Sequence, residues 1–204
     1  MPEESGSAGP DTRERILSCA EALFGAKGYD SVAVSDIAEA CNISTSLIYY
    51  HYRDKESLLR ALIERAEEVL SRPAIAALEH GSSAGERIAA FTHAWVETSL
   101  SHRPLVRILI RPFTDPEGPF ASEFHTMIQQ AIGQLADVIE RGVADGEFEQ
   151  VDPYLSAECL FALVNTRVVA RAVNAPHSKH LDASPAQTAD FICRLFLQGI
   201  GRPC

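Results

Sequence analysis

The chain has 204 residues, of which 46% are hydrophobic, so it is long and apolar enough to bury a sizeable core in one or two domains. It contains no uncharged apolar run of about 18 residues and no apolar segment near its start, which argues against a membrane span and a secretory signal and predicts a cytoplasmic protein. The net charge of -10 alone disfavours a nucleic-acid partner, and five scattered cysteines without C-x-x-C spacing predict neither disulfides nor a metal or cofactor site.

The first part of the chain predicts a tail followed by a scaffold helix. Residues 1–10 are polar and rich in Gly, Ser and Pro, and we expect them to be disordered. From Asp11 onward, apolar residues recur with the period of one helical face until Gly28, which ends the segment. The predicted buried positions of this helix are Ile16, Leu17, Ala20, Leu23 and Phe24.

Residues 34–55 carry the most informative pattern. A short helix with one apolar face is followed by the run Asn42-Ile43-Ser44, which breaks the period with residues suited to a tight turn. The Ser44 hydroxyl can cap a second short helix, which begins at once. The buried positions of the two helices are Ile37, Ala38, Cys41, Leu47 and Ile48. This arrangement predicts a helix-turn-helix, whose second helix enters the DNA major groove.

A longer helix is predicted next. Asp54 is placed to cap it, and its apolar positions extend to about Arg72, with Pro73 just beyond the predicted end. Acidic residues outnumber basic ones in the region that holds the predicted helix-turn-helix. Residues 11–60 contain eight acidic residues and only six basic ones, which are Arg13, Arg15, Lys27, Arg53, Lys55 and Arg60. We therefore expect few phosphate contacts and a plot of log K against log[salt] no steeper than about -6.

One pattern in this chain resembles the DNA-binding domain of the tetracycline-repressor (TetR) family of bacterial regulators: a helix ending in G-Y, then D-I-A-E-A, then N-I-S-x-x-x-I-Y-Y-H-Y-x-D-K-E-x-L-L. The resemblance implies an all-α homodimer, with a three-helix DNA-binding domain over residues 11–57 and a ligand-binding and dimerisation domain over residues 58–204. It also implies a transcriptional repressor that leaves a palindromic double-stranded operator when a small-molecule effector binds. The residues do not distinguish repression from activation.

The resemblance also implies roles for eight residues: Ser35, Ser44, Thr45, Ser46, Tyr49, Tyr50, His51 and Lys55. Tyr49 and Lys55 match family positions that contact phosphates, and the rest of the second helix faces the groove or its walls. Ser35 stands where a basic residue is common and offers only a hydroxyl. Ala33 stands where Ser or Thr often caps the first helix of the pair, so that cap is either missing or shifted to Ser35. Tyr52 replaces a core phenylalanine and is expected to pack inside.

The C-terminal part predicts five further helices over residues 84–100, 104–113, 120–144, 153–173 and 186–200. Asp152 and Pro153 open the fourth of these in the N-cap and N1 positions. That helix is apolar on nearly every face and must be covered on several sides. Pairing the last two helices with their copies in a second subunit would complete the burial and form a four-helix interface. An ordinary monomer core is the alternative.

Aromatic and apolar residues in the same region are candidates for an effector cavity. These are Phe91, Trp95, Phe113, Phe124, Met127, Phe161, Asn165 and Arg167, each of which has plain core packing or ion pairing as its alternative role. Asn165 and Arg167 are the most informative, because a polar group on so apolar a helix is unfavourable unless paired. Arg167 would either pair with a carboxylate or recognise an anionic ligand.

Two rival functions come from other classes. A hydrolase would need a nucleophile with a base, and no G-x-S-x-G elbow is present, so we predict no catalytic residues and no enzyme. The other rival is a helical small-molecule carrier or interaction protein with a weakened DNA-binding domain, which the acidic balance and the absent cap at Ala33 favour.

Overall fold

The computed structural model describes residues 10–110, 121–175 and 182–201. Within these ranges the chain is helical and contains no strand, apart from one isolated bridge between Phe148 and Gly201. This confirms the predicted all-α fold. Residues 1–9 of the expected tail and the expected cavity residue Phe113 lie outside the described residues. Pro10, the last residue of the expected tail, instead begins the first helix.

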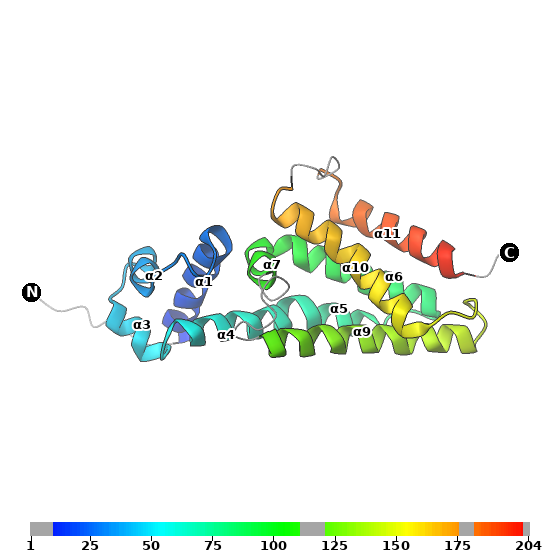
Figure 1. Cartoon of the computed structure of the whole chain (residues 1–204), viewed down its shortest axis with the longest axis horizontal. Coiled ribbons are helices and arrows are strands. Elements are labelled where there is room, and N and C mark those ends of the chain that lie inside the picture. Colours follow the sequence, from blue (N-terminus) through cyan, green and yellow to red (C-terminus); the bar gives the residue numbers. More distant parts are fainter. Residues whose placement is uncertain (1–9, 111–120, 176–181, 202–204) are drawn as a thin grey trace, which may run out of the picture.

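Three helices form a compact unit at the N-terminal end, which we call the head: α1 (Pro10–Lys27), α2 (Val34–Cys41) and α3 (Thr45–His51). In Figure 1 the head stands at one end of an elongated molecule, and the remaining helices form a bundle at the other end. Its core contains the side chains predicted from the helical period, among them Ile16, Phe24, Ile37 and Ile48, all of which are buried.

Local hydrogen bonds explain where the head helices begin and end. Asn42 adopts a left-handed conformation with φ of 53°, and the following amide of Ile43 donates to the carbonyl of Ala38 at 3.0 Å, which closes α2. Ser44 then caps α3 as predicted, because its Oγ accepts from the amide of Leu47 at 3.3 Å. The turn between α2 and α3 is therefore specified by adjacent residues.

The start of α2 lacks a capping side chain. Ala33 occupies the N-cap position and has no side-chain acceptor, so the amides of the first turn receive no hydroxyl or carboxylate from it. Asp36 supplies the other half of a capping box, since its Oδ2 accepts from the backbone amide of Ala33 at 2.7 Å. Of the two predicted alternatives, a missing cap or a cap shifted to Ser35, the structure has the missing cap, and the acidic side chain in the first turn partly replaces it.

One long helical run links the head to the bundle. It comprises α4 (Lys55–Ala66), a single π-helical turn η1 (Glu67–Ser71) and α5 (Arg72–Ala77). Asp54 caps its start, with Oδ1 accepting from the amide of Ser57 at 2.7 Å. The predicted end before Pro73 is wrong, because the helix continues through this proline to α5.

The π turn explains how the proline is accommodated. In an α-helix a proline removes one hydrogen bond, and its ring clashes with the carbonyl four residues earlier. Here the amide of Arg72 donates to the carbonyl of Glu67, five residues back, so the turn immediately before Pro73 is wider than an α turn. Pro73 then occupies the first turn of α5, where no intrahelical donor is required.

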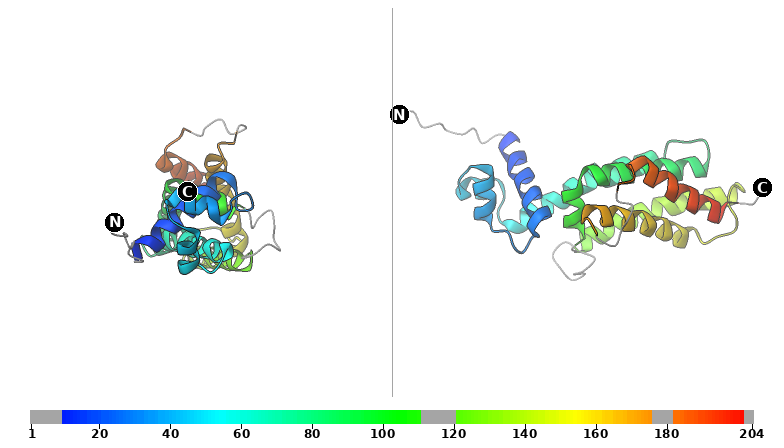
Figure 2. Two further views of the ribbon diagram at one scale, coloured as in Figure 1. Left: turned by 90° about the vertical axis from the view of Figure 1, so that its left-hand side faces the viewer. Right: turned by 90° about the horizontal axis from the view of Figure 1, so that it is seen from above.

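The bundle contains the remaining described helices: α6 (Ala84–Ser101), α7 (Arg103–Leu109), α9 (Ala121–Ala144), α10 (Pro153–Ala172) and α11 (Pro185–Ile200). α11 packs mainly on α6, and α10 packs mainly on α9, so α10 and α11 form one outer side of the bundle. Figure 2 shows the bundle from above, with these two helices crossing its visible face. None of the described helices is long and apolar enough to cross a membrane.

The head touches the bundle through α1, α4 and α7. Gly25 in α1 lies directly against Pro104, where an added Cβ would come within 2.8 Å of the proline Cα. Arg107 in α7 donates through Nε to the carbonyl of Ala172 at 2.6 Å and through Nη1 to the carbonyl of Gly25 at 3.5 Å. The same side chain therefore connects the end of α10 to the head.

Candidate nucleic-acid surface and effector cavity

The helix α3 presents an exposed polar and aromatic face. Tyr49 is 54% and Tyr50 is 73% exposed, although tyrosines are usually at least half buried. Thr45 and Ser46 are also exposed and lie in the first turn of the helix. Ile48 on the opposite side is buried, so α3 is fixed to the head by its apolar face. Four of the predicted contact residues, Thr45, Ser46, Tyr49 and Tyr50, are thus exposed on α3.

Lys55 begins α4, just after α3. Its Nζ lies 4.1 Å from the ring centroid of Tyr29 and 5.9 Å from that of Phe24. A cation held over an aromatic face is attracted by the ring quadrupole, which fixes the position of the side chain without neutralising its charge. Tyr29, the tyrosine of the G-Y pair in the sequence pattern, is therefore a supporting residue for which the pattern predicted no role, and it keeps a positive charge close to α3.

The other predicted contact residues are placed less uniformly. Ser35 is exposed at the second residue of α2, and Ser44 is exposed while its hydroxyl caps α3. His51 is partly buried, its ring lies edge-on to Tyr50 at 5.1 Å, and its Nε2 is buried without a hydrogen-bond partner among the described residues. Of the eight predicted residues, His51 is the one whose ring is turned largely inward.

Two arginines lie near the C-terminal end of α3. The Arg53 side chain is 94% exposed between α3 and α4. Arg13 stands over the ring of Tyr52 at 5.1 Å, and the Tyr52 hydroxyl donates to the carbonyl of Arg13 at 3.3 Å. Tyr52 is buried, and burial raises the pKa of its hydroxyl, which agrees with the core role predicted for it. α3 itself carries no acidic residue, and the nearby Arg53 lies 3.9 Å from the carboxylate of Asp54.

A small cavity lies inside the bundle where η1, α6, α7, α9 and α10 meet. Its volume is about 30 Å³, and four of the predicted ligand-contacting residues line it: Trp95, Phe124, Met127 and Asn165. The rest of the wall is formed by Leu70, Ser99, Val106, Leu109, Ile110, Ile128, Val168 and Val169. The Asn165 amide donates to the carbonyl of Phe161 at 2.9 Å, so its nitrogen is already paired within α10.

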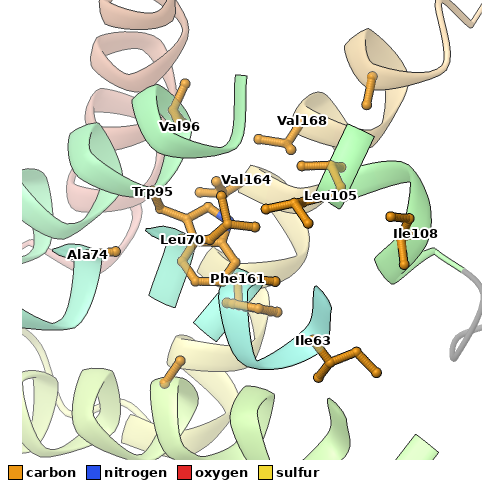
Figure 3. Close-up of a cluster of buried hydrophobic side chains, with 14 of the residues drawn as sticks. Ile63, Leu70, Ala74, Trp95, Val96, Leu105, Ile108, Phe161, Val164 and Val168 are labelled. Carbon is orange, nitrogen blue, oxygen red and sulfur yellow. The ribbon is translucent and has the colours of Figure 1, made fainter. Parts of the chain in front are cut away.

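Phe91, Phe161 and Arg167, the other described candidates, do not border this space. Phe91 and Phe161 are buried next to Trp95. Their ring centroids lie 5.9 and 5.2 Å from that of Trp95, so they pack against its ring. Arg167 lies on the outer side of α10, in a different hollow. Figure 3 shows Trp95 and Phe161 within a continuous apolar cluster that also includes Leu70.

An apolar groove runs along the outer side of α10 and α11. It has a volume of about 1040 Å³ and is lined by Cys159, Ala162, Leu163, Thr166, Arg167, Ala183, Gln187, Thr188, Phe191, Ile192 and Leu195. Phe191 is 60%, Leu195 53% and Leu163 38% exposed, so large apolar side chains face outward in one place. Patches of this kind on a protein surface mark interaction sites.

The fold and the exposed α3 define a two-part helical protein of the helix-turn-helix regulator class. Two family models match it in succession. The model described as bacterial regulatory proteins, tetR family, matches residues 16–62, and the tetracyclin repressor-like C-terminal domain matches residues 81–168. The chain belongs to the TetR family.

Individual relatives agree with this assignment. The chain is 38% identical over 52 residues to the biofilm operon negative transcriptional regulator IcaR of Staphylococcus epidermidis, a match that covers 26% of this chain and 28% of IcaR. It is 26% identical over 195 residues to the uncharacterized regulator YvkB of Bacillus subtilis, covering 93% and 97% of the two chains. The crystal structure of the TetR-family regulator PfmR from Thermus thermophilus has the same fold, with a TM-score of 0.77, 24% identity and coverage of 92% and 100%.

Proposed function

We propose that this protein is a homodimeric DNA-binding transcriptional repressor that releases a palindromic operator when a small molecule binds in its bundle. The DNA-binding domain comprises residues 11–57, and residues 58–204 bind the effector and dimerise. The match to IcaR, a negative regulator, lies in the helix-turn-helix region, which supports the DNA-binding part of this proposal.

The observation that carries the proposal is the exposed face of α3. Two adjacent tyrosines, Tyr49 and Tyr50, are largely solvated there, next to the exposed hydroxyls of Thr45 and Ser46. Hydroxyl groups can bond both phosphate oxygens and base edges, and a helix anchored by its apolar face can present them to the major groove. Tyr49 and Lys55 would anchor the backbone, and Thr45 and Ser46 would contribute to sequence choice.

The groove on α10 and α11 supports the homodimer. Its exposed side chains are almost all uncharged and come from two neighbouring helices, so a second copy placed across a two-fold axis would cover them with the same surface. The four helices would then form a bundle at the subunit interface. Two copies of α3, about 34–36 Å apart, would read successive turns of an operator.

The effector acts by preferring one of two dimer geometries. A ligand shifts such an equilibrium only to the extent that it binds the two states unequally. The central cavity borders both η1, which belongs to the run ending in the head, and α10, which lies at the proposed interface. A ligand in this cavity would therefore change the separation of the two α3 helices.

A mobility-shift titration with duplex DNA flanking the protein's own coding region tests the proposal. Wild-type protein is expected to bind at low ionic strength. Tyr50→Ala is expected to bind about tenfold or more weakly, because each subunit loses the contacts that this tyrosine makes with the groove or its walls. Tyr154→Ala is the matched control, since Tyr154 is a 45% exposed tyrosine on α10. Failure of the wild type to shift any duplex would favour the rival reading of a ligand carrier with a weakened head.

A further inference from the structure

The cavity in the bundle is too small, at this volume, to hold an organic ligand. Its volume of about 30 Å³ equals the share of one molecule in liquid water. Binding of an effector in this space therefore requires the walls to move apart. The chemistry of the walls then decides which ligand stabilises the open form.

Trp95 contributes a buried donor without a partner. Its side chain is 4% exposed, and Nε1 makes no hydrogen bond to any described residue. An indole nitrogen only donates, and a buried donor left unpaired is unfavourable. The ring is held in place by stacking on Phe91 and by contact with Phe161, so it is not free to turn toward solvent. In Figure 3 the indole lies inside the apolar cluster, beside Leu70 and Val164.

The described part of the cavity wall offers no counter-charge to a charged ligand. All of its described lining residues are uncharged, and most are aliphatic or aromatic. Arg107 in the adjoining helix α7 is engaged by the carbonyls of Ala172 and Gly25, and Arg167 lies in the outer groove. A carboxylate entering this space would lose its hydration without gaining a counter-charge, which is strongly unfavourable.

The wall formed by η1 is suited to movement. Leu70 belongs to the π turn, and the next residue, Ser71, is 1% exposed with its Oγ unpaired among the described residues. A single π turn inside an α-helix is an irregularity that often accompanies functional sites. Leu70 belongs to the helical run that begins at α4, directly after α3. Displacing Leu70 would alter this run, so opening of the cavity would be transmitted to the head.

We propose that the effector is an uncharged, mainly apolar molecule with a hydrogen-bond acceptor such as a ketone oxygen, which receives the Trp95 Nε1 hydrogen as the ligand displaces Leu70. This rests on the proposed function for its regulatory consequence, but the binding chemistry can be measured without DNA. Trp95 selects for the acceptor, the uncharged wall selects against anions, and Leu70 acts as the gate.

Titration calorimetry with three eight-carbon probes tests this chemistry. 2-Octanone carries the acceptor, 1-octene lacks it, and octanoate adds a negative charge. The full-length protein is expected to bind 2-octanone at least about tenfold more tightly than either of the others, because only the ketone pairs the buried donor without adding charge. No detectable binding of 2-octanone up to its solubility limit would overturn the proposal, and so would equal or tighter binding of octanoate.

Two variants separate the donor from the gate. Trp95→Phe keeps an aromatic ring and removes the donor, so the preference for 2-octanone over 1-octene should fall to within about twofold. Survival of the full preference in this variant would overturn the role of Trp95. Leu70→Ala removes the gate and should tighten binding of 2-octanone and 1-octene alike; unchanged affinities would refute the displacement of Leu70.

The two proposals can fail separately. If wild-type protein binds 2-octanone in the Trp95-dependent manner but shifts no duplex, the ligand chemistry stands and the repressor function fails. If the protein shifts its operator but prefers octanoate, the function stands and the ligand chemistry is refuted.

Discussion

Phe191 offers the sharpest test of the proposed subunit interface. It lies in the α11 side of the groove and is 60% exposed in one chain. Complete burial of a phenylalanine side chain contributes about 1.5–3 kcal/mol, so burying the exposed part contributes roughly 1–2 kcal/mol. A two-fold interface contains the residue twice, which gives about 2–4 kcal/mol for Phe191→Ala. We expect the dimer dissociation constant to rise by at least about 30-fold.

Analytical ultracentrifugation over a range of concentrations measures this change. Tyr50→Ala is the matched control, because Tyr50 is an aromatic residue that is 73% exposed, but it lies on α3 in the head. The control should dimerise like the wild type while binding DNA weakly. The interface would be wrongly placed if Phe191→Ala and Tyr50→Ala dimerised equally well, or if the wild type were a stable monomer at micromolar concentration.

Three further predictions concern the head and the stability of the fold. Lys55→Ala should weaken binding to operator and random duplex alike in mobility shifts, because a phosphate contact carries no sequence information; a loss limited to the operator would reassign the residue. Gly25→Ala should lower the free energy of unfolding in urea by about 1–3 kcal/mol, since its Cβ would lie 2.8 Å from Pro104, and an unchanged midpoint would contradict this close approach. Glu86 accepts from the amide and hydroxyl of Ser82 at 2.7 and 2.8 Å, which holds its pKa below the ordinary 4.5. The stability from these bonds is therefore present above pH 4.5 and is lost as the pH falls through the folded-state pKa, so Glu86→Gln should show a smaller loss in acid melting curves than the wild type.

The head followed from sequence because its determinants are local. The cap at Ser44, the left-handed turn at Asn42 and the cap at Asp54 each depend on residues within four positions of one another. The apolar period also identified the buried side of each helix, since a helix places every third or fourth residue on the same face. These signals do not depend on how distant parts of the chain meet.

Pro73 shows the limit of such local rules. A proline usually ends a helix, and the prediction stopped there. The structure instead widens the preceding turn, with Arg72 donating to Glu67, and packing of η1 against α6 and α9 covers the irregular segment. Whether a helix ends or bulges at a proline depends on what packs beside it, which neighbouring residues in the sequence do not specify.

The cavity and the groove were decided by tertiary structure. Phe161, Asn165 and Arg167 lie within seven positions on one helix, yet each meets a different environment. Asn165 borders the cavity, Phe161 packs against Trp95, and Arg167 lines the outer groove. Helical periodicity identified candidate effector-contacting residues but not where each one lies in the bundle. α10 is apolar on several faces, and the neighbouring helices determine what each face contacts. The unpaired nitrogen of Trp95 is likewise a property of the packed bundle, since a donor becomes unsatisfied only when surrounding helices exclude water and offer no acceptor.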